Sequence, residues 1–175
     1  MLKSKNLILK EPTQKDYKSL SKVKLSDEFY LMVGNDPAES VFLNKEKFDK
    51  SFHESLGKKN YWYVYKVDDL IGVAFLHSLD VEDKRARYAV AIYNEENWNK
   101  GYGYEITQCV LKYAFHNLNL HKVDLRVLEY NKRAIASYEN SGFVQEGVLR
   151  ENAFINNVWH NDIIMGILCH EFQGS

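Results

Sequence analysis

Hydrophobic positions recur with two different periods along the chain, and this contrast predicts where strands and helices lie. Alternating or short runs rich in β-branched and aromatic residues predict strands, whereas three- and four-residue spacing predicts helices. The predicted strands are residues 7–11, 61–67, 70–79, 85–92, 122–128, 143–149 and 159–169. The predicted helices are a segment through 13–23, then 45–56, a central helix that includes 106–118, and 131–140.

The order of these elements predicts the fold class. It runs strand, two helices, three strands, helix, strand, helix and two strands, with residues 26–40 ambiguous because Gly34 and Pro37 interrupt them. This order favours an α/β (α+β) domain with a mixed, mostly antiparallel central sheet of about seven strands flanked by helices. One strand–helix–strand crossover lies at its centre. The length of 175 residues predicts a single domain over 1–175.

Composition and charge exclude some classes of partner. Hydrophobic residues make up 45% and charged residues 27%, which is typical of a globular protein. The net charge of −1 argues against broad electrostatic binding to nucleic acid, and the cluster Lys84, Arg85 and Arg87 is interpreted as a solvated face. The sequence contains no long apolar segment, signal peptide or lipidation motif, so no membrane partner and a cytoplasmic location are expected.

The two cysteines predict no metal site and no disulfide. Cys109 lies on the apolar face of the central helix, and Cys169 lies near the end of a predicted strand. Neither has a second cysteine or a histidine at metal-ligand spacing. Both are therefore expected to be buried thiols in a reducing compartment.

A candidate anion site lies between the predicted strand 85–92 and the central helix. Gly101 and Gly103 precede the apolar helical face, and Lys100 adds a positive charge beside them. Backbone N–H groups at a helix N-terminus lack internal partners and carry about half a positive charge, so they bind phosphate well. The alternative is an ordinary tight turn before a helix. The dinucleotide fingerprint is not matched, because its third glycine position holds Ile106.

Three ordered motifs carry a resemblance to a known family. The first is Trp-Asn-Lys-Gly-Tyr-Gly at 98–103, the second is Asn-Lys-Arg-Ala-Ile-Ala-Ser-Tyr-Glu-Asn-Ser-Gly-Phe at 131–143, and the third is Glu-Gly-Val-Leu-Arg at 146–150 followed by Asp162. Together they resemble the GCN5-related N-acetyltransferases, in the branch of ribosomal-protein N-terminal and spermidine acetyltransferases. Trp98 stands where the family pattern usually has Gln or Arg.

The resemblance implies acetyl-CoA as cosubstrate and direct transfer of its acetyl group to an amine. Main-chain N–H groups around 100–104 would hold the diphosphate, and the strand 88–92 would pair with the pantetheine arm. The residues to which the resemblance gives a cofactor-binding role are Ala91, Ile92, Trp98, Asn99, Lys100, Gly101, Tyr102, Gly103, Tyr104, Asn131 and Ala134.

Tyr138 is the candidate general acid. The resemblance places it near the thioester sulfur, and its chemistry agrees. A phenol with a pKa of about 10 can donate a proton to a leaving thiolate whose conjugate thiol has a pKa of about 8.5. The alternative is packing, because Ala134, Ile135 and Tyr138 share a helix face.

The general base is less well defined by the sequence. Presenting a lysine-like amine in its neutral form at pH 7 costs about 4.6 kcal/mol, whereas a peptide α-amine costs about 1 kcal/mol. Many relatives carry a glutamate where this chain has Arg87. The spermidine branch has an acidic residue on its third strand where this chain has Phe75, and an acidic segment for which this chain offers only residues 30–40, with Asp36 and Glu39. Both differences weaken the expectation of polyamine specificity without excluding it. His77, with a reference pKa of about 6.5, is a candidate base.

Glu95 and Glu96 are further candidates for the base, and a solvated loop explains them equally well. The resemblance implies an acetyl-CoA-dependent N-acetyltransferase that acts on a small primary amine or a protein N-terminus. The alternative is a non-catalytic acyl-CoA-binding or regulatory domain of the same fold. A homodimer is expected from family habit alone.

Overall fold

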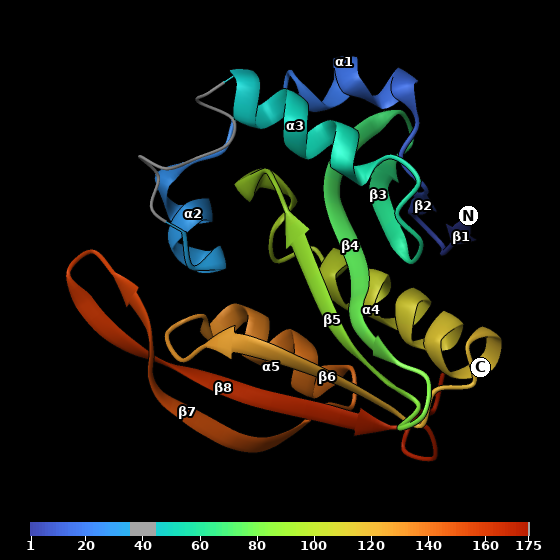
Figure 1. The fold of residues 1–175 in the computed structure, drawn as a ribbon, viewed down its shortest axis with the longest axis vertical. Coiled ribbons are helices and arrows are strands. Elements are labelled where there is room, and N and C mark those ends of the chain that lie inside the picture. Colours follow the sequence, from blue (N-terminus) through green and yellow to red (C-terminus); the bar gives the residue numbers. More distant parts are fainter. Residues whose placement is uncertain (36–44, 175) are drawn as a thin grey trace.

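The computed structural model describes residues 1–35 and 45–174. Its centre is a sheet of eight strands in the spatial order β1-β2-β3-β4-β5-β6-β8-β7 (Figure 1). The strands are β1 (Leu2–Lys3), β2 (Ile8–Lys10), β3 (Tyr61–Lys66), β4 (Asp69–Asp80), β5 (Arg85–Ile92), β6 (Lys122–Leu128), β7 (Val144–Ile155) and β8 (Val158–Leu168).

All neighbouring strands are antiparallel except β5 and β6, which are parallel. Their pairing is short: it joins residues 85–87 of β5 to residues 122–124 of β6 and ends there. Pairing of β5 with β4 continues to Ile92, opposite Gly72. In Figure 1 the two parallel strands start close together and then run apart. The sheet therefore has a fork at its centre.

Helices cover both faces of the sheet and create two cores. One core lies between the sheet and α4 and α5, and includes Ile106, Val123 and Met165. The other packs α1, α2 and α3 on β3, β4 and β5, and includes Phe52 and Tyr63. The helices are α1 (Tyr17–Leu20), α2 (Asp27–Val33), α3 (Lys45–Ser55), α4 (Tyr102–Lys112) and α5 (Lys132–Asn140).

Local sequence signals set the helix ends near the fork. Ser26 caps α2, because its side chain accepts a hydrogen bond from the Phe29 N–H. Gly34 ends the same helix with a φ of 78°, a left-handed conformation that favours glycine. Asn131 caps α5 in the same manner by accepting from the Ala134 N–H. These caps fix where α2 and α5 meet.

The predicted fold class is confirmed, with differences in individual elements. Strands β5 and β6 have the predicted bounds, and the sheet has eight strands rather than about seven because β1 adds a two-residue edge strand. The helix expected through 13–23 is reduced to a short 3-10 turn and the four-residue α1. The ambiguous segment contains α2. Strand β7 continues to Ile155, past a register shift near Leu149.

The prediction that both cysteines are buried is wrong for Cys169. That residue follows the last position of β8 and is exposed, while Cys109 is half-buried on α4. The strand ends one residue earlier than expected, so the Cys169 thiol lies in the turn beyond it. Its backbone N–H donates to the His121 carbonyl (2.9 Å). Both thiols are free.

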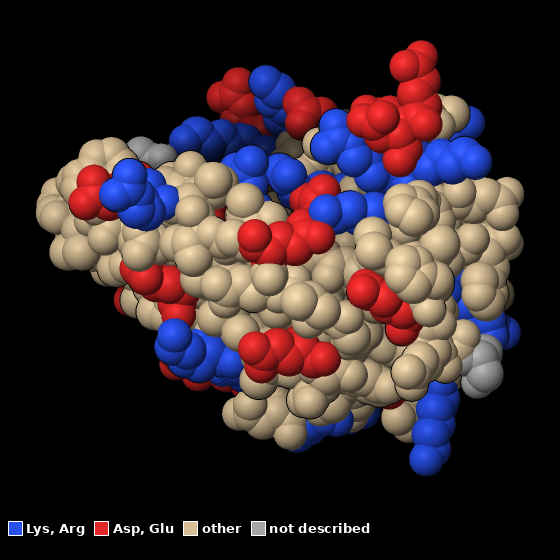
Figure 2. Space-filling model, turned by 90° about the horizontal axis from the view of Figure 1, so that it is seen from below, with Lys and Arg blue, Asp and Glu red and all other residues tan. Residues whose placement is uncertain are grey.

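The surface carries both signs of charge. On the face shown in Figure 2, Lys and Arg are interspersed with Asp and Glu between wide areas of other residues. This face offers no continuous basic surface of the kind that nucleic acids bind. In the part of the chain that the structure describes, no helix has the length and apolar character needed to cross a bilayer.

Candidate active site

A cavity of about 1030 Å³ occupies the fork between β5 and β6. It reaches both faces of the sheet. On one face its wall is formed by the N-terminus of α4, by α5 and by the edge of β5. On the other face its wall is formed by aromatic residues of β3 and β4, by α2, and by residues of β6 and β8. The fork therefore connects a helix N-terminus to a pocket on the far side of the sheet.

The N-terminus of α4 presents unpaired backbone donors to this cavity. The first backbone hydrogen bond of the helix runs from the Glu105 N–H to the Gly101 carbonyl (3.0 Å). Within the described ranges, no acceptor pairs with the N–H groups of residues 99–104. The α4 dipole adds positive potential at the same point. This arrangement suits a phosphate group.

The two glycines at this turn serve different purposes. Gly101 has a φ of 79°, and an added Cβ there would meet nothing within 4 Å, so the backbone conformation is what favours glycine. Gly103 lies inside the first turn of α4, where a Cβ would lie 3.2 Å from the Ser137 Oγ. Gly103 therefore allows α4 and α5 to approach each other closely.

Trp98 connects the α4 turn to β5 and α5. Its indole N–H donates to the Ile92 carbonyl (2.8 Å), and the Arg133 guanidinium lies 3.7 Å from its ring centroid. Burial lowers the pKa of Arg133, although arginine stays charged at any physiological pH. The sequence reasoning missed Arg133. Arg133 also lies 3.9 Å from the Glu28 carboxylate of α2, and this anion offsets the unfavourable position of a cation in the first turn of α5.

The edge of β5 that faces the fork has free main-chain groups. The Tyr93 N–H donates to the carbonyl of Ile71 in β4 (2.8 Å). Along an antiparallel strand, the main-chain groups of successive residues point alternately toward one neighbouring strand and away from it. Ala91 therefore faces β4, while Val90 and Ile92 face the fork. Ala91 and Ile92 were both predicted to bind the cofactor, and both line the cavity. The N–H of Ile92 faces the cavity, whereas the N–H of Ala91 faces β4 and is not available to a ligand.

Asn131 and Ala134 lie together at the start of α5 and line the cavity. The Asn131 side chain has two protein partners: it accepts from the Ala134 N–H (3.1 Å) and donates to the Met32 carbonyl (3.0 Å). Its direct role is thus to cap α5 and to hold the C-terminal end of α2.

Tyr138 on α5 lies at the wall of the cavity and is 8% exposed. Its ring packs edge-on against Tyr88 (centroids 6.4 Å apart) and Phe143 (5.8 Å). Among the residues that the structure describes, none forms a hydrogen bond with the Tyr138 hydroxyl. Burial raises the pKa of Tyr138 to about 12. The phenol therefore stays protonated at neutral pH and retains an unused donor.

The far side of the cavity combines aromatic rings with two charged side chains. Tyr61 and Phe75 stack with ring centroids 5.2 Å apart and an interplanar angle of 16°. Burial raises the pKa of Tyr61, which keeps its hydroxyl neutral. Arg126 of β6 and Asp162 of β8 also line this wall. No role was predicted for Tyr61 or Arg126. Alternation along a strand predicts which side chains share a face of the sheet, but it does not predict that the face borders a cavity.

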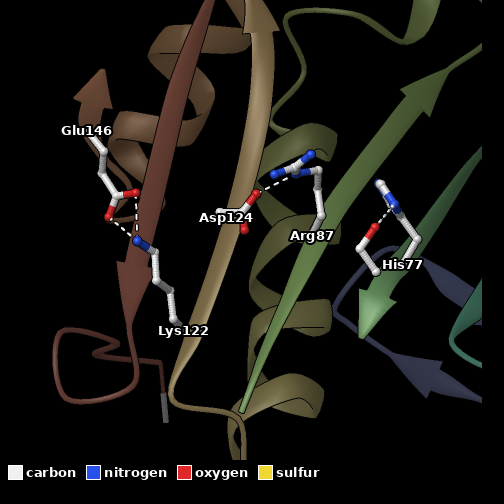
Figure 3. Close-up of polar contacts among 6 residues, drawn as sticks. His77, Arg87, Lys122, Asp124 and Glu146 are labelled. Carbon is white, nitrogen blue, oxygen red and sulfur yellow. Dashed lines mark hydrogen bonds and ion pairs between the residues drawn. The ribbon is translucent and has the colours of Figure 1, made fainter. Parts of the chain in front are cut away.

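The structure does not bring His77 to the cavity. Phe75 is the last β4 residue in the cavity wall, and His77 lies beyond it, exposed, with its Nδ1 3.1 Å from the Ser78 Oγ (Figure 3). Burial, and then the charge of Arg87, lower the pKa of His77. Its predicted role as base has no geometric support. Glu95 and Glu96 form a 3-10 turn outside the cavity wall, and Asp36 and Glu39 lie outside the described residues.

Arg87 cannot act as a general base, and its side chain instead joins β5 to β6 at the closed end of the fork. Its Nε donates to the Asp124 Oδ1 (2.5 Å) across the last paired register of β5 and β6 (Figure 3). The side chains are 29% and 13% exposed. The pair joins the two strands at the point where they begin to diverge.

The donor set matches acetyl-CoA. Backbone N–H groups at the α4 turn and the Arg133 guanidinium suit its phosphates, and the N–H of Ile92 suits the amides of its pantetheine arm. The Tyr138 hydroxyl suits its sulfur. Over residues 1–35 and 45–174, no group of three His, Cys, Asp or Glu side chains is arranged to hold a metal ion.

Comparison with known proteins identifies the class that this fold and site define. The model of the acetyltransferase (GNAT) domain matches residues 6–144, and the chain belongs to this family. It is an N-acetyltransferase that uses acetyl-CoA to acetylate an amine. The identification favours turnover over the non-catalytic alternative.

Particular relatives show how far the similarity extends. The chain is 32% identical to the spermidine N(1)-acetyltransferase of Vibrio cholerae over 76% of each chain. It is 24% identical to the probable N-acetyltransferase YjcK of Bacillus subtilis, over 93% of this chain and 86% of that protein. The crystal structure of spermidine N-acetyltransferase from Vibrio cholerae in complex with CoA and spermine superposes with a TM-score of 0.80 at 26% identity, covering 96% of this chain and 98% of that one.

Proposed function

We propose that the fork between β5 and β6 is the catalytic cleft, with acetyl-CoA bound on the α4 and α5 side and the acceptor amine on the α2 side. The N–H groups of residues 99–104 bind the diphosphate, and the Val90 and Ile92 main chain holds the pantetheine arm. Trp98 fixes both the Ile92 carbonyl and the Arg133 guanidinium. Bound acetyl-CoA supplies an activated acyl group at the base of the fork.

Tyr138 is the proposed general acid. Acetyl transfer forms a C–N bond and breaks the C–S bond, and the leaving sulfur takes the electron pair and needs a proton. The Tyr138 hydroxyl donates a hydrogen bond to the developing thiolate or gives it a proton. The attacking nitrogen loses one proton as the amide forms, and that proton restores the Tyr138 phenol. One observation carries the proposed role of Tyr138. Its phenol is buried and protonated, lies at the cavity wall, and forms no hydrogen bond within the described part of the chain.

The acceptor must reach the acyl carbon as a neutral amine. A peptide α-amine is neutral at pH 7 at a cost of about 1 kcal/mol, against about 4.6 kcal/mol for a lysine-like amine. Among the described residues that line the cavity, Asp162 is the one acidic side chain, and Arg126 adds a positive charge that repels cations. We therefore favour a small amine or a peptide N-terminus over a polyamine such as spermidine, although spermidine acetyltransferases are among the relatives.

Release of free CoA thiol from acetyl-CoA in the presence of an amine panel tests the proposed function. The panel contains monoamines, amino acids, short peptides and spermidine. The proposal expects amine-dependent thiol release that depends on Tyr138, and saturable binding of acetyl-CoA that does not. Binding that survives Trp98→Ala together with Gly101→Val, in a folded protein, would show that acetyl-CoA binds elsewhere.

We further propose that the enzyme acts in the cytoplasm as a homodimer. Two free thiols support a reducing compartment. At the end of the β7–β8 hairpin, Phe154 and Trp159 pair at 4.8 Å and are 56% and 57% exposed, which supports a contact surface. Sedimentation of the protein and of a Phe154→Ser variant measures this, and a monomeric wild type would contradict it.

A further inference from the structure

Two opposite charges share one face of the sheet on the acceptor side of the cleft. Alternation along β6 places Val123, Leu125 and Val127 in the core under α4 and α5. Arg126 therefore points to the opposite face. Asp162 of β8 lies opposite Leu128, so it shares this second face with Arg126.

Neither charge is neutralised by the other. In the described chain, no carboxylate forms an ion pair with Arg126, although Arg85 and Arg87 on the neighbouring β5 both have acidic partners. One oxygen of Asp162, Oδ2, accepts from the Asn152 Nδ2 (2.7 Å), which orients the carboxylate and leaves Oδ1 available. An oriented carboxylate and an unpaired guanidinium thus line the same wall.

Arg126 and Asp162 are close enough in the sheet to contact one small ligand. Arg126 lies opposite Ile164, two residues from Asp162, so the two are diagonal neighbours with Cα atoms about 7–8 Å apart. No ion pair or hydrogen bond joins them directly. Two side chains that extend from such positions on the same face can contact one small molecule. Its amine would lie at Asp162, whose free carboxylate oxygen can accept the ammonium proton, and its anionic group would lie at the Arg126 guanidinium, which binds carboxylates in a bidentate manner.

We propose that Arg126 and Asp162 form a two-charge acceptor subsite that selects a primary amine which also carries a carboxylate, such as an amino acid. This inference rests on the proposed function of the cleft. The stacked rings of Tyr61 and Phe75 provide an apolar wall for the remainder of the acceptor. The guanidinium disfavours polycations, because a second or third ammonium group would meet Arg126.

The test compares amino acids with their carboxamides as acceptors in the thiol-release assay. The two forms share the side chain and the amine and differ in the anionic group. Wild type is expected to prefer the carboxylate about tenfold in kcat/KM at matched concentrations of neutral amine. Arg126→Gln should reduce that preference to about one by lowering activity on the carboxylate. Asp162→Asn should lower activity on both forms about tenfold.

Arg150→Gln is the matched control, because Arg150 is an exposed arginine of β7 outside the cavity and should keep the wild-type preference. Equal rates for the carboxylate and the carboxamide in wild type, a preference that survives Arg126→Gln, or a higher rate with spermidine would each overturn the inference. Absence of turnover with every amino acid would also overturn it. Binding of acetyl-CoA, measured by calorimetry on the same protein, distinguishes that result from failure of the cofactor site.

Discussion

At the scale of single residues, the burial of Tyr138 determines what it can do. A phenol removed from water resists ionisation, and here burial raises the pKa of Tyr138 to about 12. The side chain therefore keeps its proton at any pH at which the enzyme works. Its edge-on contacts with Tyr88 and Phe143 hold the ring in one orientation. A donor that is both fixed and protonated suits a step in which charge develops on a leaving sulfur.

Tyr138→Phe should slow turnover without unfolding the protein. Loss of the proton donor is expected to lower kcat about a hundredfold, with little change in KM for acetyl-CoA. Stability should change by less than about 1 kcal/mol, because the hydroxyl lacks a hydrogen-bond partner in the described chain. Steady-state kinetics and thermal unfolding measure the two effects. An unchanged kcat would remove Tyr138 from the mechanism.

The dependence of the rate on pH follows from the same pKa. Tyr138 is protonated below its folded-state value of about 12, so it produces no loss of activity until pH approaches that value. The acceptor amine gains reactivity as it loses its proton. We expect kcat/KM to rise from about pH 6 towards the pKa of the acceptor and to show no descending limb below about pH 10. A fall between pH 7 and 9 in a protein that stays folded would indicate a different acid.

The groups that we propose for the cofactor side are visible in the sequence, and those that we propose for the acceptor side are not. Gly101, Trp98 and Tyr138 belong to contiguous motifs whose order is visible in the chain. Arg126 and Asp162 come from strands far apart in the sequence, and their proximity depends on the β6–β8 register. No local pattern encodes that register.

At the scale of elements, the close approach of β4 to β5 depends on Gly72. A Cβ at this position would lie 2.3 Å from the Ala91 carbonyl oxygen, which belongs to the backbone of the strand that borders the cleft. Because a backbone atom cannot rotate away, a larger residue would force the two strands apart. The position of β5, and therefore the wall of the cavity that β5 forms, depends on Gly72 of the neighbouring strand β4.

Gly72→Ala is therefore expected to destabilise the protein by about 3 kcal/mol and to raise KM for acetyl-CoA. Gly147 on β7 is the control, because a Cβ there would meet nothing within 4 Å, so Gly147→Ala should change stability by less than about 0.5 kcal/mol. Denaturant unfolding measures both. Equal effects of the two substitutions would contradict the proposed role of the close contact.

Elements with strong local patterns were predicted well, and the weakly patterned ones were not. Alternation gave β6 its bounds, and the asparagine cap and following glycine gave α5 its bounds to within one residue. The two-residue β1 is too short to carry any period. The extension of β7 passes a register shift near Leu149 and a positive φ of 51° at Glu151, and the sequence shows neither.

At the scale of the whole molecule, the sheet consists of two antiparallel parts joined at a narrow connection. Strands β1 to β5 form one part, and β6, β8 and β7 form the other. Among the described residues, they are joined in the sheet by the pairing of residues 85–87 with 122–124, and beside it the His121 N–H donates to the Lys84 carbonyl (2.6 Å). The Arg87–Asp124 pair lies at the end of this connection, where the cleft opens.

A double-mutant cycle on Arg87 and Asp124 should measure how strongly this connection is held. Their charge-assisted hydrogen bond of 2.5 Å and partial burial predict a coupling free energy of about 1.5–3 kcal/mol. The exposed Arg85–Asp83 pair, at 3.4 Å, should show less than about 1 kcal/mol. Substitutions at Arg87 should also raise KM for acetyl-CoA. Coupling no larger than that of the exposed pair would contradict a special role for Arg87.

The early end of pairing between β5 and β6 leaves a signature that can be followed by amide hydrogen exchange. The amides of Val90 and Ile92 point into the fork, whereas those of Ala91 and Tyr93 are committed to β4. In the free enzyme, deuterium should thus enter at every second residue of this strand. Addition of acetyl-CoA should slow exchange at Val90 and Ile92 and leave the intervening residues unchanged, so that the cosubstrate behaves as the missing neighbour of an incomplete sheet.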